Sequence, residues 1–177
     1  MGSEERCIDD EIPFDTPDSW EWARFNSVMI LQSGQDLSPD QYNAQKHGIP
    51  YITGASNIVN ESVVINRWTE HGRSFANKGD LLISCKGTIG AMAFLEEDIV
   101  HIARQIMAIR SYDEIDKFYL KIVVESLVEQ LKAKAKSMIP GISREDVLGA
   151  LIPIPPLFEQ QRIATRVNEL NAIIEST

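Results

Sequence analysis

The spacing of apolar residues changes near Arg110, and this change limits the folds that are open to the chain. Before Arg110, short runs alternate apolar and polar residues or are wholly apolar, and turn residues separate them. Such runs are typical of β-strands. After Arg110, apolar residues recur at spacings of four, three and four, as on amphipathic helices. The sequence therefore predicts a mixed α+β fold, in which a β-rich part precedes the helices.

The β-rich part is expected to hold about six or seven strands joined by short connections, with too few helices between them for a doubly wound parallel sheet. Strands are predicted for W-E-W-A-R-F from Trp20, I-P-Y-I-T at 49–53, S-V-V-I-N at 62–66, I-V-H-I at 99–102 and Q-I-M-A-I-R at 105–110. The run K-G-D-L-L-I-S-C-K-G-T-I-G-A-M-A-F-L predicts a hairpin with a tight glycine loop at Gly87–Gly90.

Two long helices are predicted in the second part. Ser111 and Asp113 are expected to cap the first helix, which should run to about Lys136. Ser143 and Asp146 form a predicted capping box, after which A-L-I-P-I-P returns to extended chain. The last helix is expected from Pro156. Its apolar stripe consists of Ile163, Val167, Leu170 and Ile174, and we expect this stripe to pack on another chain or on a part of this protein that the sequence lacks.

Length and composition favour one domain in the cytoplasm. The chain has 177 residues, 44% of them apolar, which is enough for one sizeable core. It lacks a run of about 20 apolar residues and a secretory signal, so we expect neither a membrane span nor export. Cys7 and Cys85 are far apart and lack a C-x-x-C spacing, so they are expected to be free thiols.

The net charge of -9 is unevenly distributed. Residues 1–21 hold eight acids and one arginine, whereas the remaining 156 residues hold 16 basic and 18 acidic side chains. A nearly neutral body can present a basic face, so the overall charge does not exclude a nucleic-acid partner. The acidic stretch is expected to be a solvated arm or linker.

Five phrases, in this order, resemble the specificity subunits of type I restriction-modification enzymes. They are D-S-W-E-W-A-R-F, I-P-Y-I-T-G-A-S-N-I, K-G-D-L-L-I-S-C-K-G-T-I-G, R-Q-I-M-A-I-R and I-P-I-P-P-L-F-E-Q-Q-R-I, and they span residues 18–174. The resemblance implies an acidic arm at 1–17, a target recognition domain at 18–155 and the start of a coiled-coil helix at 156–177. Full members resemble two such units in tandem. This chain has one, as an excised half, a half-length subunit that dimerises, or a unit cut at an arbitrary boundary.

The resemblance implies that the domain reads one half of a split site in double-stranded DNA, while paired helices fix the spacing of the two halves. The second recognition domain would lie in the same protein or come from dimerisation. A separate modification subunit would bring S-adenosylmethionine and methylate adenine. A separate restriction subunit would use ATP and Mg²⁺ for translocation and cleavage. No cofactor and no catalytic residue is expected in this chain.

Two groups of residues are the first candidates for DNA contact. Ser84, Lys86 and Thr88 lie beside glycines that let the backbone approach a phosphate. Alternatively, these glycines only permit a sharp hairpin. Arg104 and Gln105 suit bidentate recognition of guanine and adenine. The alternative for them is an exposed edge strand or a structural ion pair.

Further candidates are Arg144, next to a glycine turn, and Asn57, in a polar cluster with Thr53 and Ser56. Lys136 is also a candidate, together with Lys132 and Lys134. These three lysines lie at the end of a predicted helix, where cations also offset the helix dipole, so that structural role comes first.

An enzyme acting on DNA and a protein–protein adaptor are the competing functions. An adenine methyltransferase needs Asp or Asn before Pro-Pro and an aromatic residue, and Ile154-Pro155-Pro156-Leu157 lacks this polar residue. A metal-dependent nuclease needs paired acids near a lysine. Asp80 and Lys86 have that spacing, but Ser84 stands in place of the second acid. In an adaptor, the acidic arm and the last helix would be the working parts. His47, His71 and His101 are isolated from one another, so no metal site is expected.

Overall fold

The computed structural model describes residues 7–134 and 141–175, with mostly strands up to Ser111 and mostly helices after it. The predicted mixed α+β class is confirmed. The strands are β1 (Glu21–Arg24), β2 (Met29–Ser33), β3 (Ile49–Ile52), β4 (Ile58–Val59), β5 (Ser62–Val63), β6 (Trp68–Thr69), β7 (Phe75–Asn77), β8 (Leu81–Ser84), β9 (Met92–Phe94), β10 (Ile99–Ile102), β11 (Ile106–Ser111) and β12 (Leu151–Ile154). The helices are α1 (Phe25–Val28), α2 (Lys117–Lys134), α3 (Arg144–Leu148) and α4 (Leu157–Glu175), with 3-10 turns η1 (Asp9–Glu11), η2 (Pro39–Gln41) and η3 (Ala55–Asn57).

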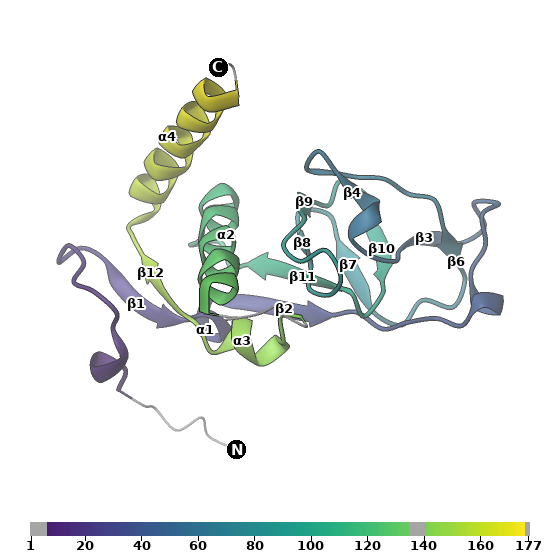
Figure 1. Ribbon diagram of the computed structural model, residues 1–177, viewed down its shortest axis with the longest axis horizontal. Helices are drawn as coiled ribbons and strands as arrows, with labels where there is room; N and C mark the ends of the chain where they lie inside the picture. Colours follow the sequence, from purple (N-terminus) through teal and green to yellow (C-terminus); the bar gives the residue numbers. More distant parts are fainter. Residues whose placement is uncertain (1–6, 135–140, 176–177) are drawn as a thin grey trace.

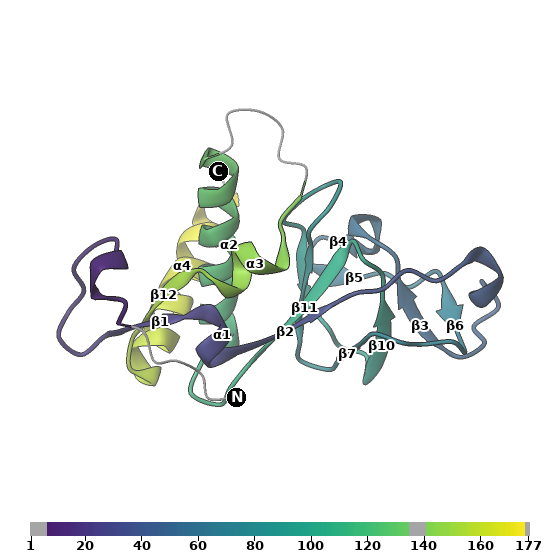
Figure 2. The same ribbon diagram turned by 90° about the horizontal axis from the view of Figure 1, so that it is seen from below.

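The molecule is elongated (Figure 1), with α2, α4 and the β1–β12 ribbon at one end and a β lobe at the other. The β lobe is the sheet of order β6-β3-β10-β7 with its connecting segments. A central antiparallel sheet of order β2-β11-β8-β9 lies between the two ends. Figure 2 shows the same division from below.

The two inner strands of the central sheet are buried on both faces. Leu81 and Ile83 of β8 belong to a core that includes α2, whereas Leu82 belongs to a second core with Ile102 and Ile52 of the β lobe. A strand that is covered on both sides has no polar face, so all four residues of β8 are buried. This explains the wholly apolar run L-L-I at this position.

The strand predictions are confirmed for the longer runs. The predicted number of about six or seven strands is wrong, because the described residues form twelve. The predicted glycine hairpin is β8 and β9, and I-V-H-I and Q-I-M-A-I-R form β10 and β11. Only Ser62–Val63 of the predicted strand at 62–66 is a strand. The β lobe instead contains two- and three-residue strands, which are too short to show a period in the sequence. One pair, β10 with β3, is parallel.

Helix α2 begins later than predicted, and Ser111 and Asp113 do not cap it. Ser111 is the last residue of β11 and pairs with Met29 of β2. The carboxylate of Asp116 accepts from the N–H groups of Phe118 and Tyr119 and is the actual cap. The predicted capping box at α3 is confirmed, because the Ser143 hydroxyl and the Asp146 backbone N–H are 3.1 Å apart and the reciprocal bond is also present.

Part of the acidic arm packs on the β1–β12 ribbon. The ring of Phe14 lies edge-on to Trp22 with centroids 4.9 Å apart, and Glu11 pairs with Arg24. These contacts differ from the expectation of a fully solvated arm for these residues. The ribbon itself pairs strands from distant parts of the chain, with Glu21 opposite Ile154.

Helix α4 packs on the domain mainly through its first half. The Gln160 side chain is buried and bonds to Asp116, Glu114 and Pro155, and Ala164 is buried as well. Farther along, Leu170 is 43% exposed and Ile174 is 71% exposed. Ile163 and Val167 of the predicted stripe are half-buried, whereas Leu170 and Ile174 extend into solvent. Within the described ranges, no helix combines the length and apolar character that a membrane crossing requires.

Candidate nucleic-acid interface

The chain segments that carry the main candidates meet at one end of the central sheet. Strand β11 starts where β2 and β8 end, because Ile106 is opposite Ser84 and Met107 is opposite Ser33. The segments at 34–36, 85–90 and 103–105 therefore lie at the same end of the sheet. We call this region the sheet-end surface and define it by Lys86, Thr88, Arg104, Gln105 and Arg144.

Hydrogen bonds hold these segments together. The backbone N–H of Cys85 donates to the carbonyl of Gln105, and the Cys85 carbonyl accepts from the N–H of Ile142. Two residues later, the guanidinium of Arg144 donates to the carbonyl of Leu31 at 2.7 Å. Burial raises the pKa of the Cys85 thiol, which keeps it protonated and unreactive beneath this surface.

The glycine loop exposes Lys86 and Thr88 but not Ser84. Gly87 and Gly90 have φ values of 74° and 91°, which the tight turn requires. Ser84 is fully buried, and its hydroxyl donates to the carbonyl of Thr88 at 2.6 Å and accepts from the N–H of Ala91. This conformation therefore does not present Ser84 for the predicted contact with DNA, because its buried hydroxyl is used in closing the loop.

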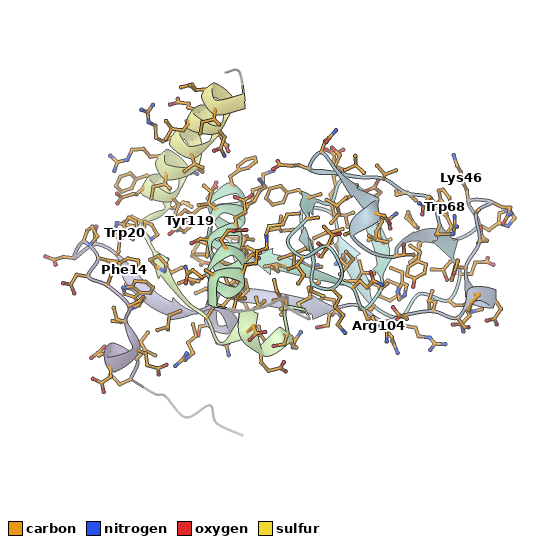
Figure 3. The ribbon with its side chains drawn as sticks, viewed as in Figure 1. Phe14, Trp20, Lys46, Trp68, Arg104 and Tyr119 are labelled. Atoms are coloured by element: carbon orange, nitrogen blue, oxygen red, sulfur yellow. The ribbon has the colours of Figure 1, made fainter. Side chains whose placement is uncertain are left out.

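Arg104 and Gln105 are both exposed at this end. The Nε of Arg104 lies 2.7 Å from a carboxylate oxygen of Asp36, which makes the structural ion pair that the sequence left open. Gln105 lies over Gly54, where an added Cβ would come within 2.6 Å of the Gln105 amide oxygen. Glycine at position 54 thus leaves room for the Gln105 side chain. Figure 3 places Arg104 at the edge of the molecule, between its two ends.

Asn57 has a structural role instead of the predicted contact. It is fully buried, and its amide oxygen accepts from the N–H and the hydroxyl of Thr53 at 3.0 and 2.9 Å. Its amide nitrogen donates to the carbonyl of Val64 at 2.7 Å. These bonds close the turn after β3, so this conformation does not present the Asn57 amide to DNA.

Among the lysines at the end of α2, Lys132 is close to the sheet-end surface. A Cβ added at Gly90 would lie 3.5 Å from the Lys132 ammonium, which also pairs with Glu129. Lys136 lies outside the described residues, so its predicted role stays a prediction. The sequence did not single out Asp36, because its partner Arg104 is 68 positions away.

The residues considered for a nuclease do not form a metal site. Asp80 is buried, and Arg110 donates to both of its carboxylate oxygens at 2.7 and 2.9 Å. This hydrogen-bonded pair raises the pKa of Arg110. Asp80 lies near the opposite end of β8 from Ser84 and Lys86. In the ranges 7–134 and 141–175, no group of three or more His, Cys, Asp or Glu side chains is placed to hold a metal ion.

His101 is buried at the base of the segment that carries Asp36. Its Nδ1 accepts from the N–H groups of Arg73 and Ser74, and its Nε2 lies 2.9 Å from the carbonyl of Gln35. These partners require a neutral ring with the proton on Nε2. Burial lowers the pKa of His101, which favours that neutral form.

A groove of about 470 Å³ lies at the helical end, between α2, the β1–β12 ribbon and Phe14. Its lining is mostly apolar, and Tyr119 is the one titratable residue in it within the described part of the chain. Burial, helped by Glu159, raises the pKa of Tyr119 to about 12, and its hydroxyl donates to the carbonyl of Pro153. Among the residues that the structure describes, none that lines the groove is therefore poised for acid–base chemistry near neutral pH. Figure 3 shows Phe14, Trp20 and Tyr119 at this end, away from Arg104.

Comparisons with known proteins identify the family. The family model for the type I restriction modification DNA specificity domain matches residues 17–177. The chain is 26% identical over 165 residues to the MjaX specificity subunit of Methanocaldococcus jannaschii and 32% identical over 182 residues to the EcoBI specificity subunit of Escherichia coli. These alignments cover 90% of this chain but 38% and 36% of the two relatives. The chain thus spans less than half the length of either relative.

Solved structures show the same relationship. The HsdS subunit of Thermoanaerobacter tengcongensis matches with a TM-score of 0.82 and 26% identity, over 93% of this chain and 40% of that protein. The S subunit of M. genitalium shares the fold, with a TM-score of 0.61 and 17% identity, over 94% of this chain and 42% of that subunit. With the family model covering residues 17–177, this chain belongs to the type I restriction-modification DNA specificity domains.

Proposed function

We propose that this domain recognises one half of a bipartite double-stranded DNA site and directs a type I restriction-modification complex to it. The single observation that carries the proposal is the convergence of Lys86, Arg104, Gln105 and Arg144 at one end of the central sheet. Three segments that are distant in sequence deliver side chains that suit phosphates and base edges to one surface.

Each side chain has a role that its chemistry favours. Lys86 sits in an exposed glycine loop and suits a phosphate contact, which fixes the position of the duplex. Arg104 and Gln105 are adjacent and suit base edges, with guanine for Arg104 and adenine for Gln105. Arg144 is anchored to β2 through the carbonyl of Leu31, so its charge is held in place beside them.

The charge distribution supports a DNA-facing β-rich part. Residues 22–112 hold eight Lys or Arg and eight Asp or Glu side chains, although the whole chain has a net charge of -9. The acidic excess lies in the arm and in the helical end. This uneven charge distribution would orient the domain relative to DNA, because the acidic end that holds α4 repels the phosphates.

The exposed half of α4 supports a role in assembly. Leu170, Ile173 and Ile174 are all exposed, and burying such side chains is favourable. In this proposal the helix pairs with that of a second recognition unit and sets the distance between the half-sites. The chain itself carries no catalytic step. The modification and restriction subunits supply S-adenosylmethionine, ATP and Mg²⁺ in the cytoplasm.

Exchange of this domain tests the proposal. We would replace it by a relative's domain in an assembled enzyme and map the methylated adenines in DNA that the hybrid modifies. One half of the methylated motif should change and the other half should stay. If the whole motif stays unchanged, the domain does not read DNA sequence, and an adaptor function becomes the better account.

A further inference from the structure

The loop at 44–48, which joins η2 to β3, is exposed along its whole length and yet firmly held. Asn43 organises it from one end. Its side-chain oxygen accepts from the N–H groups of Gln45 and His47 at 3.0 and 3.2 Å, and its side-chain nitrogen donates to the carbonyls of His47 and Trp68. The backbone of Asn43 also pairs with that of Trp68. The hydrogen bonds of one side chain, Asn43, therefore hold a loop that contributes no buried residue to the core.

The backbone of this loop adopts an uncommon conformation. Lys46 has a φ of 64°, which places a non-glycine residue in the left-handed region. Gly48 has a φ of 88°, and a Cβ there would lie 2.1 Å from the carbonyl oxygen of Thr69. The loop is thus pressed against β6 in a conformation that the surrounding bonds must maintain. Strained and ordered surface segments of this kind are often functional.

The loop displays Gln45, Lys46 and His47, all of which can bind nucleic acid. The Lys46 ammonium lies 5.9 Å from the centroid of the Trp68 ring, and Figure 3 shows the two side chains together on the β lobe. No acidic residue occurs from Gln41 to Asn60, in a chain with 26 Asp and Glu. The loop therefore presents a positive charge with no carboxylate on its own segment.

Strand β3 connects this loop to the sheet-end surface. Gly48 precedes β3, and Gly54, which lies against Gln105, follows it. Six residue steps of extended chain cover about 20 Å at 3.3 Å per residue. Along the axis of a DNA duplex this distance corresponds to about six base pairs, at a rise of about 3.4 Å each. A single duplex is long enough to reach both places.

We propose that the loop at 44–48 is a second DNA-contacting element of this domain, with Lys46 on a backbone phosphate and Gln45 and His47 beside it. The inference rests on the proposed function, since it requires that the domain bind DNA. It adds a contact that is separate from Lys86, Arg104, Gln105 and Arg144. In it, Asn43 is a positioning residue and does not touch the duplex.

Binding of the 177-residue chain to a fluorescein-labelled 30-base-pair duplex of mixed sequence tests the inference. Fluorescence anisotropy would be measured between 50 and 200 mM salt for the wild type, Lys46→Ala and Lys86→Ala. Lys117→Ala is the matched control, because it also removes one positive charge, but on α2. There the Lys117 ammonium lies over Phe94 and Phe118. Thermal melts verify that each variant is folded.

Loss of one phosphate contact should make the negative slope of log K against log salt shallower by about 0.9. It should also weaken binding about tenfold at 50 mM salt. We expect this for Lys46→Ala and not for Lys117→Ala. Asn43→Ala should weaken binding with no change in net charge. Asn43→Asp should not restore binding, because its carboxylate accepts from Gln45 and His47 but cannot donate to the carbonyls of His47 and Trp68, and it adds a negative charge near Lys46.

The outcomes separate the two proposals. If Lys86→Ala weakens binding and Lys46→Ala matches the wild type, the loop does not contact DNA and only this inference is overturned. If the wild type itself binds without any dependence on salt, the proposed function fails and the inference fails with it.

Discussion

The carboxylate of Asp36 binds both the side chain and the backbone of Arg104. One carboxylate oxygen lies 2.7 Å from the guanidinium Nε, and the other accepts from the Arg104 backbone N–H at 3.1 Å. Both side chains are substantially exposed, so the pair contributes little to stability. Its effect is on the surface, where it orients the guanidinium and offsets part of its charge.

Asp36→Asn should therefore strengthen binding to random-sequence duplex while reducing discrimination in favour of the target. The released guanidinium is free to contact a phosphate, which would steepen the salt slope by about 0.9. Anisotropy titrations at several salt concentrations measure both effects. Asp113→Asn is the control, since Asp113 follows the far end of β11. Weaker binding of Asp36→Asn to random duplex would contradict this account.

His101 should make stability fall below about pH 6.5. Its folded pKa is lowered from 6.5 by burial, so below that pH the unfolded chain binds a proton that the folded chain refuses. Stability is then lost as the pH falls toward the folded pKa, and it is unaffected by this group above pH 6.5. The charged or titratable groups near the ring are Arg73, Asp36 and Tyr51, and the ring of Phe75 lies edge-on to it.

Melting temperatures between pH 7.5 and 5.0 measure this effect. His101→Gln cannot be protonated, so its melting temperature should depend less on pH than that of the wild type. His71→Gln removes an exposed histidine and is the control. Equal pH profiles for the wild type and His101→Gln would show that the buried ring does not carry the effect.

Arg110→Met should destabilise the domain by about 2 kcal/mol. It removes two charged hydrogen bonds from Asp80, whose carboxylate is almost fully buried, while Arg110 itself is about half exposed and partly screened. Urea denaturation gives the free energy of unfolding. The double variant Asp80→Asn with Arg110→Met should lose less than the sum of the two single changes, because they share one interaction. If the losses of unfolding free energy in the two single variants add up in the double variant, the two side chains do not stabilise each other.

Gln160→Leu should destabilise the junction of α4 by about 3 kcal/mol. It leaves the N–H of Asp116 and the carbonyls of Glu114 and Pro155 without their buried partner. Gln161→Leu makes the same change at an exposed neighbour and should be nearly neutral. Chemical denaturation measures both, and hydrogen exchange should show faster opening of the first turns of α4 in the Gln160 variant only.

The sequence predicted the elements whose determinants are local. The β8–β9 hairpin depends on glycines within its own loop, and the capping box at α3 on residues three apart. The start of α2 was wrong because S-Y-D-E-I-D offers several caps, and the choice among them depends on how far β11 pairs with β2. That pairing joins residues about 80 positions apart, which no local pattern reports.

The same reasoning applies to the candidate site. Lys86, Thr88, Arg104, Gln105 and Arg144 could be proposed because their residue types suit DNA, and they are all exposed. Ser84 and Asn57 have suitable chemistry too, but their hydrogen bonds are used within their own turns. Asp36 was missed because its role exists only once β2 and β11 lie side by side. A polar residue type does not reveal whether its partner is solvent or the protein.

The antiparallel pairing of Arg24 with Leu151 makes the recognition domain a closed excursion from a two-stranded stem. Everything between these residues departs from the stem and returns to it, and α4 continues from the same place. Under the proposed function, exchange of the residues between the two stem strands would replace the part of the domain that contacts DNA, whereas the stem and α4 would stay the same.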